Sequence, residues 1–246
     1  VHLRALAKSF LQRVGNYLLI VTRDYKTVIF VHPQRLLDER ARLKVKVYKL
    51  VLDTDNPTRH DLEILEGLAA DGRSPQELFQ AHCEAFSVDR VTQRFYREYA
   101  QLFEHTQKVI AENNRGIALF KDRAGLHAFT QRLLGRVMFL YFLQKKLWLA
   151  SDPKFLTNWY KRLVVGEQKN YYADFLEKLF FETLNRRRPN DDSPWGNIPY
   201  LNGGLFDRDY DFLLYLPNEL FDPNSDTSIL GFFNSYNFTV QEDTPL

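Results

Sequence analysis

Residues 124–149 read AGLHAFTQRLLGRVMFLYFLQKKLWL, a stretch in which apolar side chains recur every three or four positions. This is the period of an α-helix with a broad apolar face, so we predict a central core helix here. Arg132 and Arg136 lie four residues apart on one side of it, where they could follow a phosphate backbone. The predicted apolar stripe consists of Leu126, Phe129, Leu133, Val137, Leu140, Tyr141 and Trp148.

Helical patterns also dominate the chain on both sides of this stretch. The tripeptide Asn56-Pro57-Thr58 is typical of a helix start, with the proline in the first turn. Three prolines between 189 and 202 predict a loop there. Further helices are predicted at about 75–83, 88–112, 153–165, 170–186 and 226–235.

The first fifty residues differ, because their apolar pattern changes from helical to alternating. Residues 1–14 predict a short basic amphipathic helix. Residues 16–21 and 27–32 predict the two strands of a hairpin. In residues 43–52 valines alternate with lysines, which predicts a third strand with one wet, basic face.

Together these patterns predict an α+β fold that is mostly α, with a small N-terminal β-hairpin part followed by a helical connector domain. We expect three parts. They are a β-containing part with a basic surface at 1–56, a helical part at 57–189 and a Pro/Gly loop with an acidic segment at 190–246.

Composition is that of a water-soluble globular protein, with 45% hydrophobic and 26% charged residues. No apolar run is long enough for a membrane span. The single cysteine, Cys83, excludes an internal disulfide and is typical of a reducing compartment, so we expect a cytoplasmic location. The valine start and the ending EDTPL lead us to expect a fragment of a longer chain.

Charge is distributed unevenly along the chain. Residues 1–50 carry eleven Lys/Arg and three Asp/Glu, or +8, whereas residues 190–246 carry one Arg and ten Asp/Glu, or −9. A basic segment can follow phosphates and an acidic one cannot. The competing interpretation is that the two ends only neutralise each other. We predict phosphate contacts from Arg4, Lys8, Arg13, Arg42, Lys44 and Lys46.

The sequence offers one weak candidate for a catalytic pair. Asp24 and Lys26 follow a predicted strand with the spacing of a Mg²⁺-dependent nuclease motif. However, Asp24 is the first acidic residue, so no second metal carboxylate precedes it. A hairpin turn with a polar tip is therefore the favoured interpretation. The scattered histidines and Cys83 predict no metal site, and no cofactor is expected in this segment.

The stretch NRRRPNDDSPWGNIPYLNGGLF (185–206) joins a basic run to a double glycine. Arg186, Arg187 and Arg188 are candidates for contact with DNA backbone, or they cap the helix that ends there. We expect Gly203 and Gly204 to allow positive φ and close backbone approach. The neighbours Tyr200, Leu205 and Phe206 are predicted to anchor this loop to the helical part.

Six segments, in this order, resemble the region ahead of the methyltransferase in bacterial restriction-modification methylases. The group is the fused, type IIG-like one, close to the methylases of phage-defence systems. The segments are NYLLIVTRDYKTVIFV (16–31), NPTRHDLEILEGLA (56–69), LLGRVMFLYFLQKKLWLASDPKFL (133–156), YYADFLEKLFFETLN (171–185), IPYLNGGLFD (198–207) and YNFTVQEDTPL (236–246).

The resemblance implies a nuclease-like part and a helical connector ahead of an adenine-N6 DNA methyltransferase. It implies double-stranded DNA as partner, together with flanking nuclease and methyltransferase parts of the same chain. S-adenosylmethionine and Mg²⁺ are implied for the parent protein. The role expected for this segment is to hold the two modules in a fixed relation along DNA, without a complete active site.

Two other interpretations stay open. One is a Mg²⁺-dependent nuclease domain in its own right that uses Asp24 and Lys26. The other is a helical protein-interaction module that makes no contact with DNA.

Overall fold

A computed structural model describes residues 5–7, 9–10, 16–37, 43–201 and 203–236. For residues 36–37, 43–44 and 88–90 it describes the backbone only. Within the predicted N-terminal helix, residues 5–7 and 9–10 are helical. The rest of that predicted helix lies outside the described residues.

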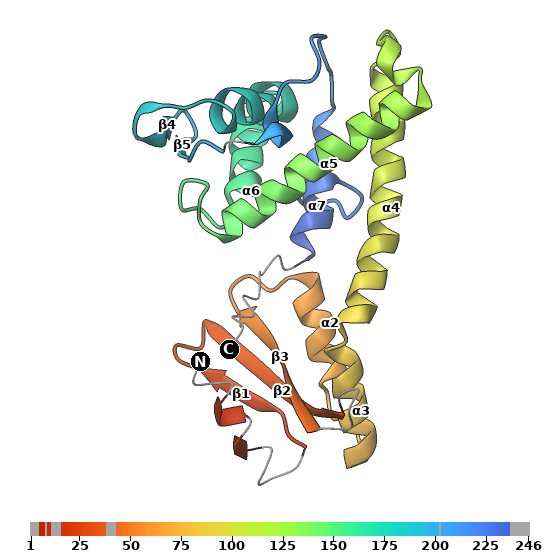
Figure 1. The fold of residues 1–246 in the computed structure, drawn as a ribbon, viewed down its shortest axis with the longest axis vertical. Helices are drawn as coiled ribbons and strands as arrows, with labels where there is room; N and C mark the ends of the chain where they lie inside the picture. Colours follow the sequence, from red (N-terminus) through yellow and green to blue (C-terminus); the bar gives the residue numbers. More distant parts are fainter. Residues whose placement is uncertain (1–4, 8, 11–15, 38–42, 202, 237–246) are drawn as a thin grey trace. The chain divides into compact units, whose positions relative to one another are not determined.

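Helices make up most of the described chain, and the longer strands all lie near the N-terminus (Figure 1). This confirms an α+β fold that is mostly α. The strands are β1 (Leu19–Thr22), β2 (Thr27–Leu37), β3 (Leu43–Asp53), β4 (Asp192–Ser193) and β5 (Gly196–Asn197). The α-helices are α2 (Arg59–Gly67), α3 (Pro75–Ala85), α4 (Val88–Asn113), α5 (Arg123–Lys145), α6 (Phe155–Tyr160) and α7 (Ile229–Asn234). Short 3₁₀-helices are η1 (Ala118–Phe120), η5 (Pro189–Asp191), η6 (Gly204–Phe206) and η7 (Asn218–Phe221).

By its internal contacts the chain divides into two compact units, Val1–Phe95 and Tyr96–Leu246. We call them unit 1 and unit 2. Because α2 and α3 pack with the strands, the described part of unit 1 contains both the sheet and two helices that follow it. The three-part functional division at 56 and 189 stays a prediction.

Unit 1 is an antiparallel sheet of order β1-β2-β3 with α2 and α3 along one face (Figure 1). Both helices begin with a capping box. Thr58 accepts a hydrogen bond from the backbone of Asp61, and Ser74 accepts one from that of Glu77. Each acidic side chain accepts a hydrogen bond from the backbone of its cap residue in return. These reciprocal bonds fix where each helix starts. The first cap residue, Thr58, lies within the predicted tripeptide, but Pro57 precedes the cap, so its predicted place in the first turn is wrong.

The core of unit 1 contains Leu50 of β3, Ile64 of α2 and Phe86 at the end of α3. A fully buried histidine, His32, lies beside it. Its ring stacks on Phe86 with centroids 5.6 Å apart, and its Nε2 lies 3.6 Å from the Sγ of Cys83. Its Nδ1 has no hydrogen-bond partner among the described residues. Burial, and His82 beside it, lower the pKa of His32 from 6.5 to about 4.

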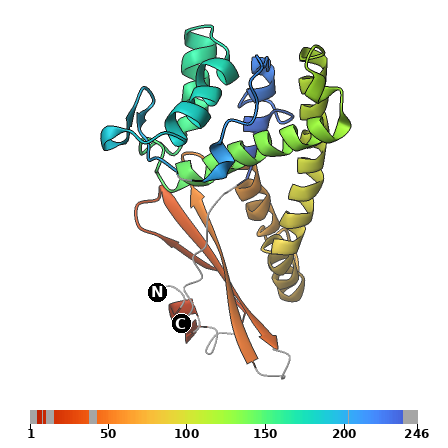
Figure 2. The same cartoon turned by 45° about the horizontal axis from the view of Figure 1, so that its top comes forward.

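Unit 2 is built around α5, which carries much of the buried core and packs against α7 (Figure 2). The predicted core helix is therefore confirmed. The hydroxyl of Tyr141 in α5 donates a hydrogen bond in the direction of α7, with Leu230 O at 3.1 Å and Asn234 Oδ1 at 2.8 Å. One predicted member of the stripe is wrong. The helix ends at Lys145, and Trp148 lies beyond it with half of its surface exposed.

The helices predicted at 153–165 and 170–186 contain wider turns than the sequence suggested. After α6 the chain continues as a π-helix, η2 (Lys161–Gly166). The second predicted helix contains η3 (Tyr172–Leu176) and η4 (Leu179–Leu184), which are also π-helical. A π-turn holds one more residue than an α-turn. Both faces of this segment bury large side chains, so the 3.6-residue period alone could not reveal these turns.

The double-glycine loop follows a path other than the predicted one. Gly203 is extended, with φ of −174°, and Gly204 begins η6, so neither glycine uses positive φ. A β-carbon on Gly203 would meet nothing within 4 Å. The expectation of left-handed backbone and close approach here is therefore wrong. Phe206 does anchor the loop, since it is buried and stacks on Phe180 at 5.7 Å, whereas Leu205 is exposed.

Candidate nucleic-acid interface

Past the end of the pairing with β1, the sheet continues as a ribbon of two strands, β2 and β3. β1 pairs only with Val28–Val31 of β2, whereas β2 and β3 pair without interruption from Thr27↔Asp53 to Leu37↔Leu43. Beyond Val31 the described structure therefore contains two strands and no third. In Figure 2 the far end of this ribbon lies beyond the ends of α2 and α3. A two-stranded antiparallel ribbon is one of the shapes that the major groove of DNA admits.

This ribbon is basic. Arg35 of β2 and Lys46 and Lys49 of β3 are exposed. The sequence of residues 27–37 and 43–52 contains no Asp or Glu. The Nζ atom of Lys46 lies 4.7 Å from the ring centre of Tyr48. We call residues 32–37 and 43–49 the basic ribbon.

The positive charge does not lie on one face of β3, as the sequence had suggested. The register is continuous, so alternate residues point to opposite faces. Lys46 is on the face of Leu50, which packs against the helices, while Lys49 is on the face of Val47. The prediction of one basic face is wrong because Lys46 and Lys49 are three residues apart, and an odd spacing places two side chains on opposite faces of a strand. The basic ribbon instead carries charge on both faces.

The other predicted N-terminal contacts are only partly visible. Lys46 is exposed, as a phosphate contact requires. For Lys44 the structure gives a strand position opposite Leu36 and no side chain. Four candidates lie outside the described residues, namely Arg4, Lys8, Arg13 and Arg42.

Asp24 and Lys26 lie in the turn between β1 and β2. The Oδ1 atom of Asp24 accepts hydrogen bonds from the backbone amides of Lys26 and Thr27, each at 3.0 Å. These two bonds lower the pKa of Asp24 below its usual value. Within the described part of the chain no three His, Cys, Asp or Glu residues come together as a metal site would need. This is the geometry of a hairpin turn with a polar tip.

The two arginines of α5 differ sharply in exposure. Arg136 is 2% exposed, and its guanidinium donates from Nε to Leu205 O at 2.7 Å and from Nη2 to Asp207 O at 2.8 Å. Arg132 is nearly half exposed, and its Nε lies 2.6 Å from Asp209. Both guanidinium groups therefore hold the loop after Gly204 against α5. A phosphate contact from Arg136 would require these bonds to break.

Arg186 and Arg187 are exposed at the end of η4, and Arg187 lies over the ring of Tyr200 at 5.3 Å. Arg188 is half-buried. Its guanidinium donates to the carbonyl of Thr183 in the last turn of η4 and, at 2.7 Å, to that of Ile198. Arg188 thus caps the helix end and fastens the β4–β5 hairpin. Of the three, Arg186 and Arg187 are the ones placed for contact with another molecule.

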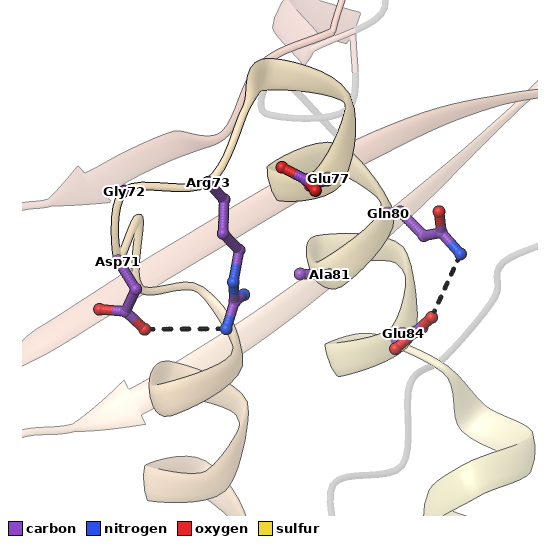
Figure 3. Close-up of a pocket in the computed structure, with 7 residues that line it drawn as sticks. All are labelled: Asp71, Gly72, Arg73, Glu77, Gln80, Ala81 and Glu84. Carbon is purple, nitrogen blue, oxygen red and sulfur yellow. Dashed lines mark hydrogen bonds and ion pairs between the residues drawn. The ribbon is translucent and has the colours of Figure 1, made fainter.

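Unit 1 also has a shallow hollow of about 470 Å³ beside α3 (Figure 3). Its charged groups are mostly engaged with one another. Arg73 pairs with Asp71 at 3.7 Å, and Gln80 donates to Glu84 at 3.5 Å. Three carboxylates and one guanidinium make this surface unsuited to phosphate. The lining residues are Asp71, Gly72, Arg73, Glu77, Gln80, Ala81 and Glu84.

Sequence reasoning missed two members of the basic ribbon, Arg35 and Lys49. Arg35 lies four residues after Val31, past the predicted end of its strand, and β2 proves to extend to Leu37. The signal that could have found both residues was the absence of acidic residues from 27–37 and 43–52.

Similarity to known proteins is distant and partial. The chain is 29% identical over 184 residues to the "Putative type II restriction enzyme and methyltransferase RM.MjaORFECS2P" of Methanocaldococcus jannaschii. The match covers 62% of this chain and 15% of that protein. The chain is thus distantly related to a type II restriction-modification protein and spans a small share of its length. No protein-family profile and no solved structure matches the chain.

No helix among the described residues combines the length and the apolar character that crossing a membrane requires.

Proposed function

We propose that this chain is the DNA-contacting connector of a type II restriction-modification enzyme. In this proposal the basic ribbon binds the phosphate backbone of double-stranded DNA. The helices of unit 2 form a scaffold that links a nuclease part to an adenine-N6 methyltransferase part. S-adenosylmethionine and Mg²⁺ would serve those other parts, and the whole enzyme would act in defence against phage.

The observation that carries this proposal is the shape and charge of the basic ribbon. A two-stranded ribbon that carries Arg35, Lys46 and Lys49, and no acidic residue, can approach phosphates without repulsion. The distant similarity to a restriction enzyme and methyltransferase supports the same partner. Contacts of this kind position a protein on DNA and carry no sequence information by themselves.

Two rival functions make different demands. A self-sufficient nuclease needs carboxylates beside Asp24, and among the described residues none joins it in a metal-binding group. A protein-interaction module without DNA contact needs no basic ribbon, although its charges could serve solubility. The first rival would be revived by Mg²⁺-dependent cutting, and the second by an absence of DNA binding.

The test is a salt titration of binding to a random-sequence duplex, followed by fluorescence anisotropy. The slope of log K against log salt is about −0.9 for each phosphate neutralised. We therefore expect the double variant Arg35→Gln/Lys46→Gln to reduce the magnitude of the slope by about 2. Loss of affinity should be similar for all duplex sequences.

A matched control removes two equally exposed charges elsewhere. Lys108 and Lys121 are exposed residues of unit 2, and Lys108→Gln/Lys121→Gln has the same net charge as the ribbon variant. We expect the control to keep the wild-type slope. Equal slopes for the two double variants would refute the proposal. It would also be refuted if the wild-type protein did not bind the duplex even at low salt.

A further inference from the structure

The turn that follows α5 has an unusual backbone. The amide of Trp148 donates to Leu143 O and that of Leu147 donates to Gln144 O, both at 3.0 Å. This pair of bonds is a Schellman motif, whose left-handed position normally holds glycine. Here Leu147 occupies that position with φ of 60°. A side chain with a β-carbon is strained in this conformation.

This strain is concentrated at one place in unit 2. Eight non-glycine residues of the described chain have positive φ, and five of them lie at 147, 150, 151, 190 and 191. The two segments that contain them are joined, since the amide of Ala150 donates to Asn197 O at 3.1 Å. Strained backbone persists where the surrounding structure enforces it, and it is frequent at binding sites.

The strained turn presents its largest side chains to solvent. Leu147 is 50% exposed and Trp148 is 52% exposed. The other two tryptophans, Trp159 and Trp195, pack edge to face with centroids 4.9 Å apart. No aromatic ring among the described residues stacks on Trp148. Core packing therefore does not account for the left-handed leucine.

Lysines flank this exposed pair in the sequence. Lys145 and Lys146 precede it and are exposed, and Lys154 follows it. The nearest acid in sequence, Asp152, accepts hydrogen bonds from the amide of Lys154 and from Asn158 Nδ2, each at 2.8 Å. The adjoining hairpin adds one exposed acid, Asp192. Residues 144–154 therefore carry three lysines and one aspartate, a net charge of +2, which favours a polyanion over a neutral surface as the occupant.

We propose that Leu147 and Trp148 form a wedge that contacts base pairs of double-stranded DNA, with Lys145 and Lys146 on the flanking phosphates. Apolar side chains that project from a basic surface insert between base steps, and aromatic rings stack on exposed bases. The wedge rests on the proposed function, in which the chain meets duplex DNA, and it adds a second contact site, in unit 2. The affinity gained from a stacked contact depends on how easily a base is unstacked. The affinity gained from a phosphate contact does not.

The test compares two duplexes of the same length and sequence, one fully paired and one with a single T·T mismatch near its centre. A mismatched base is easier to unstack. We expect wild-type protein to bind the mismatched duplex at least about 5-fold more tightly. Trp148→Ala should lower affinity for that duplex by about 5- to 100-fold and remove the preference.

A second variant separates the contact from folding. Leu147→Gly relieves the left-handed strain, so its thermal midpoint should rise by about 2–4 °C while its preference for the mismatch falls. The matched control is Gln168→Gly. Gln168 is exposed and left-handed, with φ of 54°, and lies two residues after the end of η2. It should gain stability and keep the full preference.

The outcomes distinguish the wedge from DNA binding in general. Binding to both duplexes without a preference, or equal behaviour of Trp148→Ala and wild type, overturns the wedge and leaves the basic ribbon in place. Failure of the wild type to bind either duplex at low salt overturns the proposed function, and the wedge with it.

Discussion

The Nη2 atom of Arg136 lies 3.1 Å from the Oδ1 atom of Asp209, and the arginine side chain is 3% exposed. The same guanidinium donates to two backbone carbonyls of the loop and lies 5.0 Å from the ring centre of Phe181. The Nε and Nη2 atoms of this buried cation therefore have acceptors, which offsets much of the cost of burying the charge. Arg136 is the more buried of the two α5 arginines that hold the loop after Gly204.

Removal of this side chain should destabilise unit 2. In Arg136→Ala the carbonyls of Leu205 and Asp207 lose this donor, and Asp209 keeps the exposed Arg132 as a partner. Breaking a buried charged network costs about 3–5 kcal/mol. We expect a loss of that size in the free energy of unfolding, measured by denaturant titration.

Arg132→Ala is the control for this prediction, since it removes the same type of side chain one helical turn away. Arg132 is 46% exposed, so its pair with Asp209 should contribute at most about 1 kcal/mol. Similar losses for the two variants would show that the buried bonds are not what stabilises the loop.

Stability should depend on pH through His32. Its folded-state pKa of about 4 lies below the unfolded value of 6.5, so the unfolded chain binds the proton first as pH falls. The contribution of His32 to the free energy of unfolding is therefore fully present above pH 6.5. It decreases as the pH falls from 6.5 to about 4, and it is constant below that. The total loss is about 3 kcal/mol. Denaturant titrations across this range should show the decrease in wild type and a flatter profile in His32→Leu.

The exposed His105 on α4 provides the matched substitution. His105→Leu should retain the wild-type decrease between pH 6.5 and 4. A His32→Leu profile as steep as that of wild type would assign the pH dependence to other groups.

Two glycines of unit 2 should respond to alanine in opposite directions. A β-carbon on Gly231 in α7 would lie 2.0 Å from Ser225 O, so Gly231→Ala should destabilise by about 3 kcal/mol. A β-carbon on Gly135 in α5 would meet nothing within 4 Å. Gly135→Ala should stabilise by about 0.5–1 kcal/mol because alanine favours a helix. Thermal unfolding of both variants checks the two signs.

The turn at Asp24 should not support DNA cleavage. Its carboxylate is occupied by two backbone amides, so incubation of the chain with supercoiled plasmid and Mg²⁺ should leave the plasmid intact. Asp24→Ala should instead increase amide exchange at Lys26 and Thr27, because both lose an acceptor. Mg²⁺-dependent nicking that disappears in Asp24→Ala would establish the nuclease interpretation.

The sequence was sufficient for features that depend on local pattern. The β1–β2 hairpin, the cap at Thr58 and the core helix α5 each follow from residues that are close together in the chain. The prediction also placed the end of the preceding helix near Arg188, whose capping bonds the structure shows. Periodicity and caps act within a few residues, so one sequence reveals them.

Features that depend on distant residues were beyond the sequence. Arg136 bonds to carbonyls about seventy positions away, and nothing near it in the chain signals burial. The hydrogen bonds of Arg136 and the buried ring of Phe206 set the path around Gly203, so the glycines did not need positive φ. Leu147 could not be recognised as left-handed, because the pattern of residues 124–149 continues past the end of α5.

The two-stranded end of the sheet has a consequence for self-association. Thr54 donates to Lys26 O, so even-numbered residues of β2 point their amides toward β3 and odd-numbered ones point away. Pro33 stands at an outward position beyond the end of β1 and has no amide hydrogen to offer an added strand. Copies of the chain are thereby hindered from joining edge to edge at this strand, and the ribbon remains open to other molecules.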